Sequence, residues 1–263
     1  MVLYTHTRAS YADKILEVAV GTGKSARMFS STFMKSGAVY VNTDISSKMI
    51  QLFQDNMQGA DIIVQKQDSW TEIDPEEGKK QVAILKANNE DLPFADNYFN
   101  SYISNLSLQL VSNHKNQLLE AYRVLKKGGI AGFSVWGAPE KTRNFTFLKF
   151  ALQKLGFDIN MEEEIDGAFH LSDREQLRKD ALDAGFKRVK VFITTAAACF
   201  ENDDQFLSSM VKHGFEDFCG KKGIEGSSKE DLWAKVLEEF QIQFGDDSPD
   251  VVDFEINILI AHK

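Results

Sequence analysis

The sequence predicts an α/β fold built around a mostly parallel β-sheet. Strand-like and helix-like patterns alternate through the first half of the chain, which is typical of βαβ units. Residues 15–20 form a nearly continuous apolar run that ends in a Gly-Thr-Gly turn, as expected of a central strand buried on both faces. Two late segments with alternating apolar residues, 186–195 and 252–262, can pair antiparallel at one edge of the sheet.

The strands of the first half are followed by patterns that indicate helices or turns. Ala26, Phe29 and Phe33 recur at helical spacing after the first strand. Ser46 can cap a helix after the second strand because its hydroxyl can accept a hydrogen bond from a free N–H of the first turn. Residues 59–80 are less regular, with a strand-like stretch at 62–64, and are interpreted as an insertion before the next strand. The predicted strands are residues 15–20, 38–41, 81–87, 98–104, 130–136, 186–195 and 252–262.

The second half of the chain carries two helical signals. Ser172 and Glu175 form a capping box for a helix that runs to Ala184. Residues 200–245 are also predicted to be helical, and this block is too long for a simple hairpin loop. We therefore expect it to cover another part of the protein.

The composition disfavours several classes of protein. The 263 residues carry 30 Lys and Arg against 39 Asp and Glu, and the resulting net charge of −9 disfavours binding to nucleic acid. No run of about 18 apolar residues predicts a membrane span, and the first residues lack the apolar centre of a signal peptide. Cys199 and Cys219 cannot complete a zinc cluster by themselves, so no metal site is predicted. We expect a cytoplasmic protein with buried thiols.

The glycine turn predicts a ligand that contains a nucleoside. Gly21 and Gly23 lie between a buried strand and a helix, where the lack of a Cβ lets the backbone approach a ligand. A P-loop is disfavoured because its pattern requires glycine where the sequence has Val18. Asp44 ends the second strand roughly 20 residues later, where a carboxylate can accept both hydroxyls of a ribose. NAD and S-adenosylmethionine both carry such a ribose, so both ligands stay open at this point.

Five motifs that follow one another along the chain distinguish between NAD and S-adenosylmethionine as the ligand. They are ILEVAVGTG at 15–23, VNTDISSKM at 41–49, ANNEDLPF at 87–94, FNSYISN at 99–105 and RVLKKGG at 123–129. In this order they resemble the motifs of class I S-adenosylmethionine-dependent methyltransferases, in particular the group that includes ubiquinone and menaquinone C-methyltransferases. The resemblance implies a Rossmann-like seven-stranded mixed sheet with helices on both faces and an antiparallel last strand. It also implies SN2 transfer of a methyl group from S-adenosylmethionine to a small-molecule acceptor.

The resemblance assigns residues to the methionine end of the cofactor. Glu17 would lie near this end, and Ser104 and Asn105 would face the methionine and the methyl group that is transferred. The floor under the methionine would be formed by Ala19, Gly21, Thr22 and Gly23.

The resemblance also assigns residues to the nucleoside. Asp44 would hold the ribose hydroxyls, and Ile45 and Met49 would flank the adenine. Asn88 and Asn89 match the family's pair beside the adenine amino group, where an amide can both donate and accept hydrogen bonds.

The sequence departs from the family pattern at several positions. Ala19 replaces the first glycine of the turn, and Asn100 replaces the usual Asp of the fourth strand. Gln109 stands where many members have a histidine, and no catalytic base is assigned. If the acceptor must lose a proton, the candidate bases are Tyr102, Glu162, Glu163, Glu164, Asp166, His170 and His213.

The resemblance implies one methyltransferase domain over residues 1–263, with a cofactor-binding core at 13–137. Few residues precede the first strand, where family members usually have helices that close over the cofactor. Segments 138–170 and 200–245 are therefore predicted to cover the substrate; the alternative is that the chain starts late. The second of these segments carries apolar residues that suit an apolar acceptor and suit ordinary core packing as well, namely Phe206, Met210, Trp233 and Phe240.

Two other functions stay open from the sequence. A cofactor-binding but inactive regulatory or scaffold subunit would explain the departures at Asn100 and Gln109. A NAD-dependent oxidoreductase would explain the glycine turn and Asp44, but it leaves the LPF and RVLKKGG motifs unexplained. The sequence does not indicate the acceptor, the methylated atom or the oligomeric state.

Overall fold

The chain forms two compact units in a computed structural model. The structure describes residues 1–59, 63–160, 167–199, 203–244 and 251–263. The first unit consists of Met1–Val135, Asp173–Phe192 and Asn257–Lys263, and the second of Trp136–Ser172 and Ile193–Ile256.

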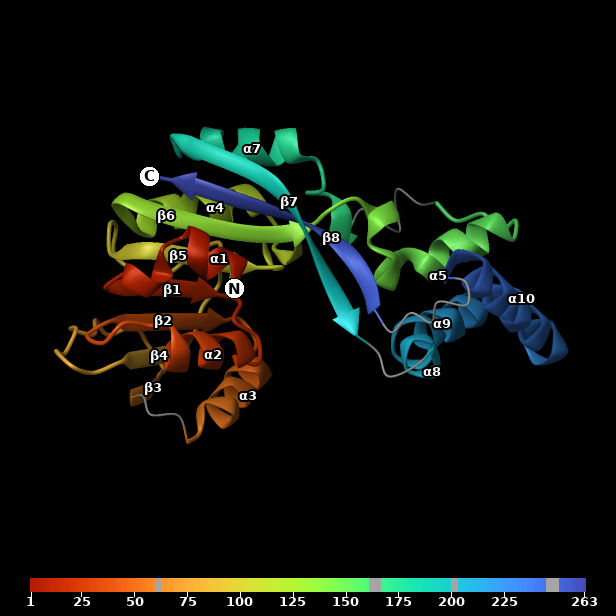
Figure 1. The fold of residues 1–263 in the computed structure, drawn as a ribbon, viewed down its shortest axis with the longest axis horizontal. Helices are drawn as coiled ribbons and strands as arrows, with labels where there is room; N and C mark the ends of the chain where they lie inside the picture. The colour runs from red at the N-terminus through yellow and green to blue at the C-terminus, as the bar shows by residue number, and fades with distance from the viewer. Residues whose placement is uncertain (60–62, 161–166, 200–202, 245–250) are drawn as a thin grey trace. The chain divides into compact units, whose positions relative to one another are not determined.

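The chain forms a mixed β-sheet, most of which belongs to the first unit, and all seven predicted strands are present (Figure 1). The strands are β1 Lys14–Val18, β2 Val39–Asp44, β3 Ile63–Gln67, β4 Gln81–Lys86, β5 Phe99–Asn105, β6 Leu125–Trp136, β7 Arg188–Cys199 and β8 Val251–His262. Their order across the sheet is β3-β4-β2-β1-β5-β6-β8-β7. The predicted fold class is confirmed, and the sheet gains an eighth strand. This strand, β3, lies in the segment interpreted as an insertion and pairs parallel with β4 at the edge.

The direction of the strands follows from their hydrogen bonds. β1 pairs parallel with β2 and β5, and the ladders between β2 and β4 and between β5 and β6 are also parallel. Gly128 on β6 bonds to Lys263, whereas Gly137 bonds to Glu255, so the partner number falls as β6 advances. The last strand is therefore antiparallel, as predicted.

Helices cover both faces of the sheet in the first unit (Figure 1). Because parallel crossovers are right-handed, the helices that connect strands on opposite sides of β1 lie on opposite faces. Tyr4 of α1 stacks on Phe29 of α2 with ring centroids 4.5 Å apart, so these two helices share a face. The helices of this unit are α1 Val2–His6, α2 Lys24–Thr32, α3 Ser47–Met57, α4 His114–Val124 and α7 Arg174–Asp183.

Arg123 explains why two of the sequence motifs occur together. Its guanidinium donates hydrogen bonds to the carbonyl oxygens of Leu92 (2.9 Å) and Phe94 (2.6 Å). It also bonds Glu120, whose carboxylate accepts from the N–H of Leu92 at 2.7 Å. The RVLKKGG motif thus holds the LPF loop in place after β4.

One predicted helix cap is wrong by a single residue. Asp173, not Ser172, is the N-cap of α7, and its carboxylate accepts hydrogen bonds from the N–H groups of Glu175 and Gln176. A carboxylate at this position also compensates the positive end of the helix dipole. Ser46 caps α3 as predicted, accepting from the N–H of Met49 at 3.4 Å.

The second unit is mainly helical and has a core of its own. Its α-helices include α5 Arg143–Lys154, α8 Asp203–Phe206, α9 Lys212–Lys222 and α10 Gly226–Phe244. Phe206 and Phe240 are fully buried in a cluster with Phe147, and Trp233 packs partly buried against it. These apolar residues therefore form the core of the unit, which favours the packing interpretation over the acceptor pocket; the side chain of Met210 lies outside the described residues. Of the helices in the described part of the chain, none is long and apolar enough to cross a membrane.

Candidate functional site

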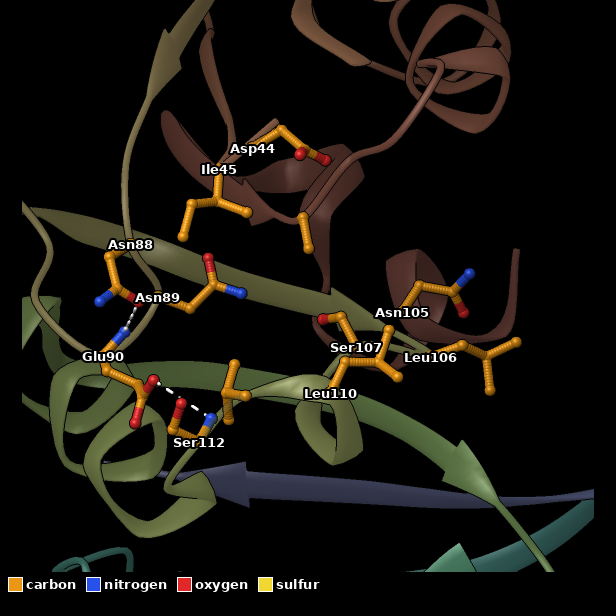
Figure 2. A pocket seen from close by; sticks show the side chains of 12 residues that line it. Asp44, Ile45, Asn88, Asn89, Glu90, Asn105, Leu106, Ser107, Leu110 and Ser112 are labelled. Carbon is orange, nitrogen blue, oxygen red and sulfur yellow. Dashed lines mark hydrogen bonds between the residues drawn. The ribbon is translucent and has the colours of Figure 1, made fainter. Parts of the chain in front are cut away.

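A cavity of about 400 Å³ opens at the carboxyl ends of the parallel strands of the first unit (Figure 2). The strand order reverses on the two sides of β1, and ligands of open α/β sheets bind in the crevice that such a reversal creates. The volume falls within the range of roughly 300–1,000 Å³ that is typical of small-molecule sites. The lining residues are Ala19, Asp44, Ile45, Asn88, Asn89, Glu90, Asn105, Leu106, Ser107, Leu110, Val111 and Ser112.

The turn after β1 has a left-handed backbone conformation at three positions, and its first residue, Ala19, lines the cavity. Ala19, Gly21 and Gly23 all have positive φ angles, of 49°, 59° and 75°. A Cβ at Gly23 would lie 2.4 Å from the ring of Phe53, so glycine is required there for space as well as conformation. Ala19 adopts the left-handed conformation although it is not glycine, which costs about 1–2 kcal/mol.

Asp44 is a polar group of the cavity whose orientation is fixed by the backbone. Its Oδ2 accepts a hydrogen bond from the N–H of Gly21 and its Oδ1 accepts one from the N–H of Ser46, both at 2.9 Å. The side chain is 6% exposed and is fixed by these two donors. Because each carboxylate oxygen can accept a second hydrogen bond, the group can still bind two neighbouring hydroxyls.

The loop after β4 supplies three polar residues to the cavity. Asn88 is exposed and its side-chain oxygen accepts from the N–H of Glu90 at 3.1 Å, whereas Asn89 is 7% exposed. The carboxylate of Glu90 accepts from the N–H groups of Ser112 (3.3 Å) and Asn113 (2.7 Å). Figure 2 shows the Asn88–Glu90 bond, which lies within this loop, and the Glu90–Ser112 bond, which connects the loop to the residues just before α4.

The loop after β5 forms another wall of the cavity. The oxygen of the Asn105 amide accepts from the hydroxyl of Ser134 at 2.7 Å. The hydroxyls of Ser104 and Ser107 lie 2.7 Å apart, and Gln117 donates to Ser104 at 3.0 Å. Ser107 lines the cavity, whereas Ser104 lies behind it and is connected to the cavity by its hydrogen bond to Ser107.

Half of the twelve predicted cofactor residues line the cavity: Ala19, Asp44, Ile45, Asn88, Asn89 and Asn105. Gly21 adjoins it through its bond to Asp44. The remaining predicted residues do not line it: Glu17, Thr22, Gly23, Met49 and Ser104. Their roles toward the cofactor stay predictions.

Glu17 has other partners. Its carboxylate is fully enclosed and accepts hydrogen bonds from the hydroxyls of Tyr4, at 2.7 Å, and Tyr40. Burial raises the pKa of the Glu17 carboxyl, although both hydroxyl bonds act in the opposite direction. The structure thus places Glu17 in a buried cluster behind the glycine turn.

Sequence reasoning missed the segment 106–112 and Glu90 as lining residues. Glu90 belongs to the ANNEDLPF motif, but nothing in the sequence distinguishes it from its neighbours. The segment directly follows β5, and the rule that ligands bind at carboxyl ends of strands could have indicated it. Leu106 has a positive φ of 50°, a second non-glycine strained position at this rim.

The candidate bases are distributed over the chain. Tyr102 is buried, its hydroxyl accepts from Gln117 at 3.2 Å, and burial raises its pKa far above the usual range. His170 and His213 are exposed and belong to the second unit. Glu162, Glu163, Glu164 and Asp166 lie outside the described residues. Gln109 is buried, and its amide finds no hydrogen-bond partner among the residues that the structure describes.

Comparison with known proteins decides between the ligands that this geometry can hold. A family described as "Methyltransferase domain" matches residues 16–133. The ubiquinone/menaquinone biosynthesis C-methyltransferase UbiE of Chromobacterium violaceum is 30% identical over 186 residues, which cover 67% of this chain and 68% of the relative. UbiE of Neisseria meningitidis is 29% identical with the same coverage. This chain belongs to the class I S-adenosylmethionine-dependent methyltransferases.

The methyltransferase also resembles solved structures. YcgJ of Bacillus subtilis superposes with a TM-score of 0.56 at 14% identity, covering 100% of this chain and 97% of that one. Phosphoethanolamine N-methyltransferase 2 of Haemonchus contortus, solved with phosphomonomethylethanolamine and S-adenosylhomocysteine, gives 0.51 at 17% identity and covers 95% of this chain and 49% of that one. At these identities the likeness establishes the fold.

The protein is thus an enzyme that uses S-adenosylmethionine to methylate a small molecule. The relatives support neither of the alternatives left open by the sequence, an inactive subunit or a NAD-dependent oxidoreductase. The cavity fits this cofactor for two reasons. The carboxylate of Asp44 has unused acceptor positions for the ribose hydroxyls, and Ile45, which is 63% exposed, offers an apolar surface for the adenine.

Proposed function

We propose that the cavity holds S-adenosylmethionine with its ribose at Asp44, its adenine beside Ile45 and the Asn88–Asn89 pair, and its methionine end toward Asn105. The fixed carboxylate of Asp44 carries this proposal, because its two backbone donors leave one acceptor position on each oxygen. Exposed Ile45 offers an apolar surface for a flat base, and the amide of buried Asn89 can read the edge of that base.

The enzyme's own residues bind and align the reactants. The bound cofactor supplies a methyl group on a positively charged sulfur, which is already a strong electrophile. The chain therefore needs to hold the acceptor in line with the methyl group and to exclude water from the cavity. The cofactor and the acceptor would lie between the turn after β1 and the loop after β5, which both contribute residues to the lining of the cavity.

We further propose that the acceptor is apolar over much of its surface. Leu106, Leu110 and Val111 line the cavity, and Leu110 is 72% exposed, so an apolar molecule would bury surface that is otherwise in water. The name of the UbiE relatives denotes C-methylation in ubiquinone and menaquinone biosynthesis. Segments 138–170 and 200–245 stay the proposed cover of the acceptor.

We propose that the enzyme acts in the cytoplasm. Cys219 is a buried free thiol, which agrees with a reducing compartment.

A labelled-methyl experiment tests the acceptor class. The enzyme is incubated with S-adenosylmethionine labelled in its methyl group and with cell extract, which is then divided into organic and aqueous phases; a prenylated quinol is tested separately. We expect label in the organic phase. Label confined to the aqueous phase would contradict an apolar acceptor, and a protein that binds the cofactor but transfers no label to any fraction would support the inactive-subunit alternative.

A matched pair of variants locates the acceptor. Leu110→Ser should raise the KM for the labelled acceptor several-fold, and by more than it weakens cofactor binding, because it removes apolar surface from the acceptor wall and leaves Asp44 and Ile45 in place. Leu119→Ser serves as the control, because Leu119 is 51% exposed on α4 and does not line the cavity. Equal effects of the two variants would contradict the assignment of this wall.

A further inference from the structure

A second cavity of the first unit shares no residue with the cofactor cavity. It measures about 510 Å³, and its lining residues come from α1 and the turn after it and from β6, β7 and β8, which are labelled in Figure 1. Its lining residues are Thr5, His6, Arg8, Ile130, Lys190, Phe192, Ile260 and His262. We call it the basic cavity.

The basic cavity concentrates positive charge in a protein whose net charge is −9. Two basic side chains, Arg8 and Lys190, line it together with the imidazoles of His6 and His262. None of the described residues that line it is acidic. Among the residues that the structure describes, no ion pair involves Arg8 or Lys190.

The pKa of His262 reflects the nearby basic side chains. Burial lowers its pKa, and the nearby cations Arg188, Arg8 and Lys190 lower it further. Three cations on two separate segments of the chain therefore act on one imidazole. Such a field favours an anion, and arginine and lysine bind phosphate and carboxylate groups through charge-assisted hydrogen bonds.

The cavity also has an apolar wall. Ile130 and Ile260 are buried at its floor, at 5% and 6% exposure, and Phe192 is half-buried. The ring of Phe192 lies 5.1 Å from the ring of His6, at an interplanar angle of 60°. A ligand that contacts both parts of the lining therefore needs an apolar or aromatic body next to its anionic group.

We propose that the basic cavity is a second ligand site, which binds a small molecule that carries a phosphate or carboxylate group on an apolar or aromatic body. Arg8 and Lys190 hold the anionic group, and Phe192 and Ile260 contact the body. This inference does not rest on the proposed placement of the cofactor, since the two cavities have no lining residue in common.

Calorimetric titration with three probes tests the site. Phenyl phosphate and benzoate carry both features, and their comparison shows which anion is preferred; inorganic phosphate lacks the apolar body. We expect saturable millimolar or tighter binding of at least one aromatic anion, and weaker binding of inorganic phosphate. Failure of both aromatic anions to bind would overturn the site, and equal affinity for inorganic phosphate and phenyl phosphate would overturn the role of the apolar wall.

Matched charge variants assign the binding to this cavity. The double variant Arg8→Gln, Lys190→Gln should weaken binding of the aromatic anion by about tenfold or more. The control, Arg178→Gln with Lys179→Gln, removes the same charges from exposed positions on α7 and should leave affinity unchanged. Equal affinities of the two double variants would overturn the proposal. Thermal unfolding confirms that each variant is folded, and Lys190→Gln alone replaces the double variant if that one is not.

Discussion

At the scale of single residues, Asp44 is held by two backbone donors in the orientation that a ribose requires. Asp44→Asn should weaken binding of S-adenosylhomocysteine by about tenfold or more, because an amide has one acceptor oxygen and its NH₂ would face an N–H group. Calorimetry with Asp183→Asn, an exposed position on α7, provides the control. Unchanged affinity in Asp44→Asn would contradict the assigned role.

Glu17 makes the stability of the fold depend on pH. Burial raises the pKa of its carboxyl above 4.5, so the folded state binds more protons than the unfolded state once the pH exceeds that value. Its favourable contribution is full below the unfolded pKa and is lost as the pH rises through the folded pKa. Glu17→Gln should therefore gain stability relative to the wild type between pH 4.5 and about pH 8.

Urea unfolding at both pH values measures this difference. Glu77→Gln, at an exposed turn position, is the control and should follow the wild type. A Glu17→Gln variant whose stability relative to the wild type is independent of pH would show that the buried carboxyl does not titrate as the structure indicates.

At the scale of elements, the turn between β1 and α2 combines conformational and steric demands. Gly23→Ala should destabilise the protein by about 2–4 kcal/mol. The new Cβ would lie 2.4 Å from the Phe53 ring, and alanine would also have to adopt a positive φ. Gly78→Ala isolates the conformational part, because Gly78 has a φ of +79° and open space around it, and should cost about 1–2 kcal/mol. Equal losses in denaturant unfolding would contradict the clash.

The elements also show what the sequence could predict about the site. The strands and the polar residues at their carboxyl ends can be predicted, because an apolar run and the motif that follows it are local features of the sequence. Asp44, Asn89 and Asn105 are predicted in this way, and all three line the cavity. Glu17 illustrates the limit. Its hydroxyl partners are 13 and 23 residues away, on α1 and β2, and no local pattern indicates that they meet.

The wall formed by residues 106–112 illustrates a second limit. It depends on the path of a loop that is fixed by long-range bonds, such as those of Glu90 to the N–H groups of Ser112 and Asn113. The edge strand β3 is a related case. The sequence marks residues 62–64 as strand-like, but the pairing of β3 with β4 is a long-range contact that the irregular segment around it does not indicate.

At the scale of the whole molecule, the second unit depends on its own aromatic core. Phe240→Ala should lower the free energy of unfolding by about 3–5 kcal/mol, because the ring is 1% exposed and packs against Phe147 and Phe206. Ile242→Ala on the same helix, at 68% exposure, should stay within about 0.5 kcal/mol of the wild type. Similar losses in the two variants would contradict the burial of this core.

The central claim is that the carboxyl ends of the parallel strands form a site for S-adenosylmethionine. Calorimetric titration of the folded wild-type protein with S-adenosylmethionine, and separately with NADH, tests it most directly. We expect saturable one-site binding of S-adenosylmethionine and no binding of NADH. Binding of NADH, or the absence of S-adenosylmethionine binding at high micromolar concentration in a sample shown to be folded, would contradict the account.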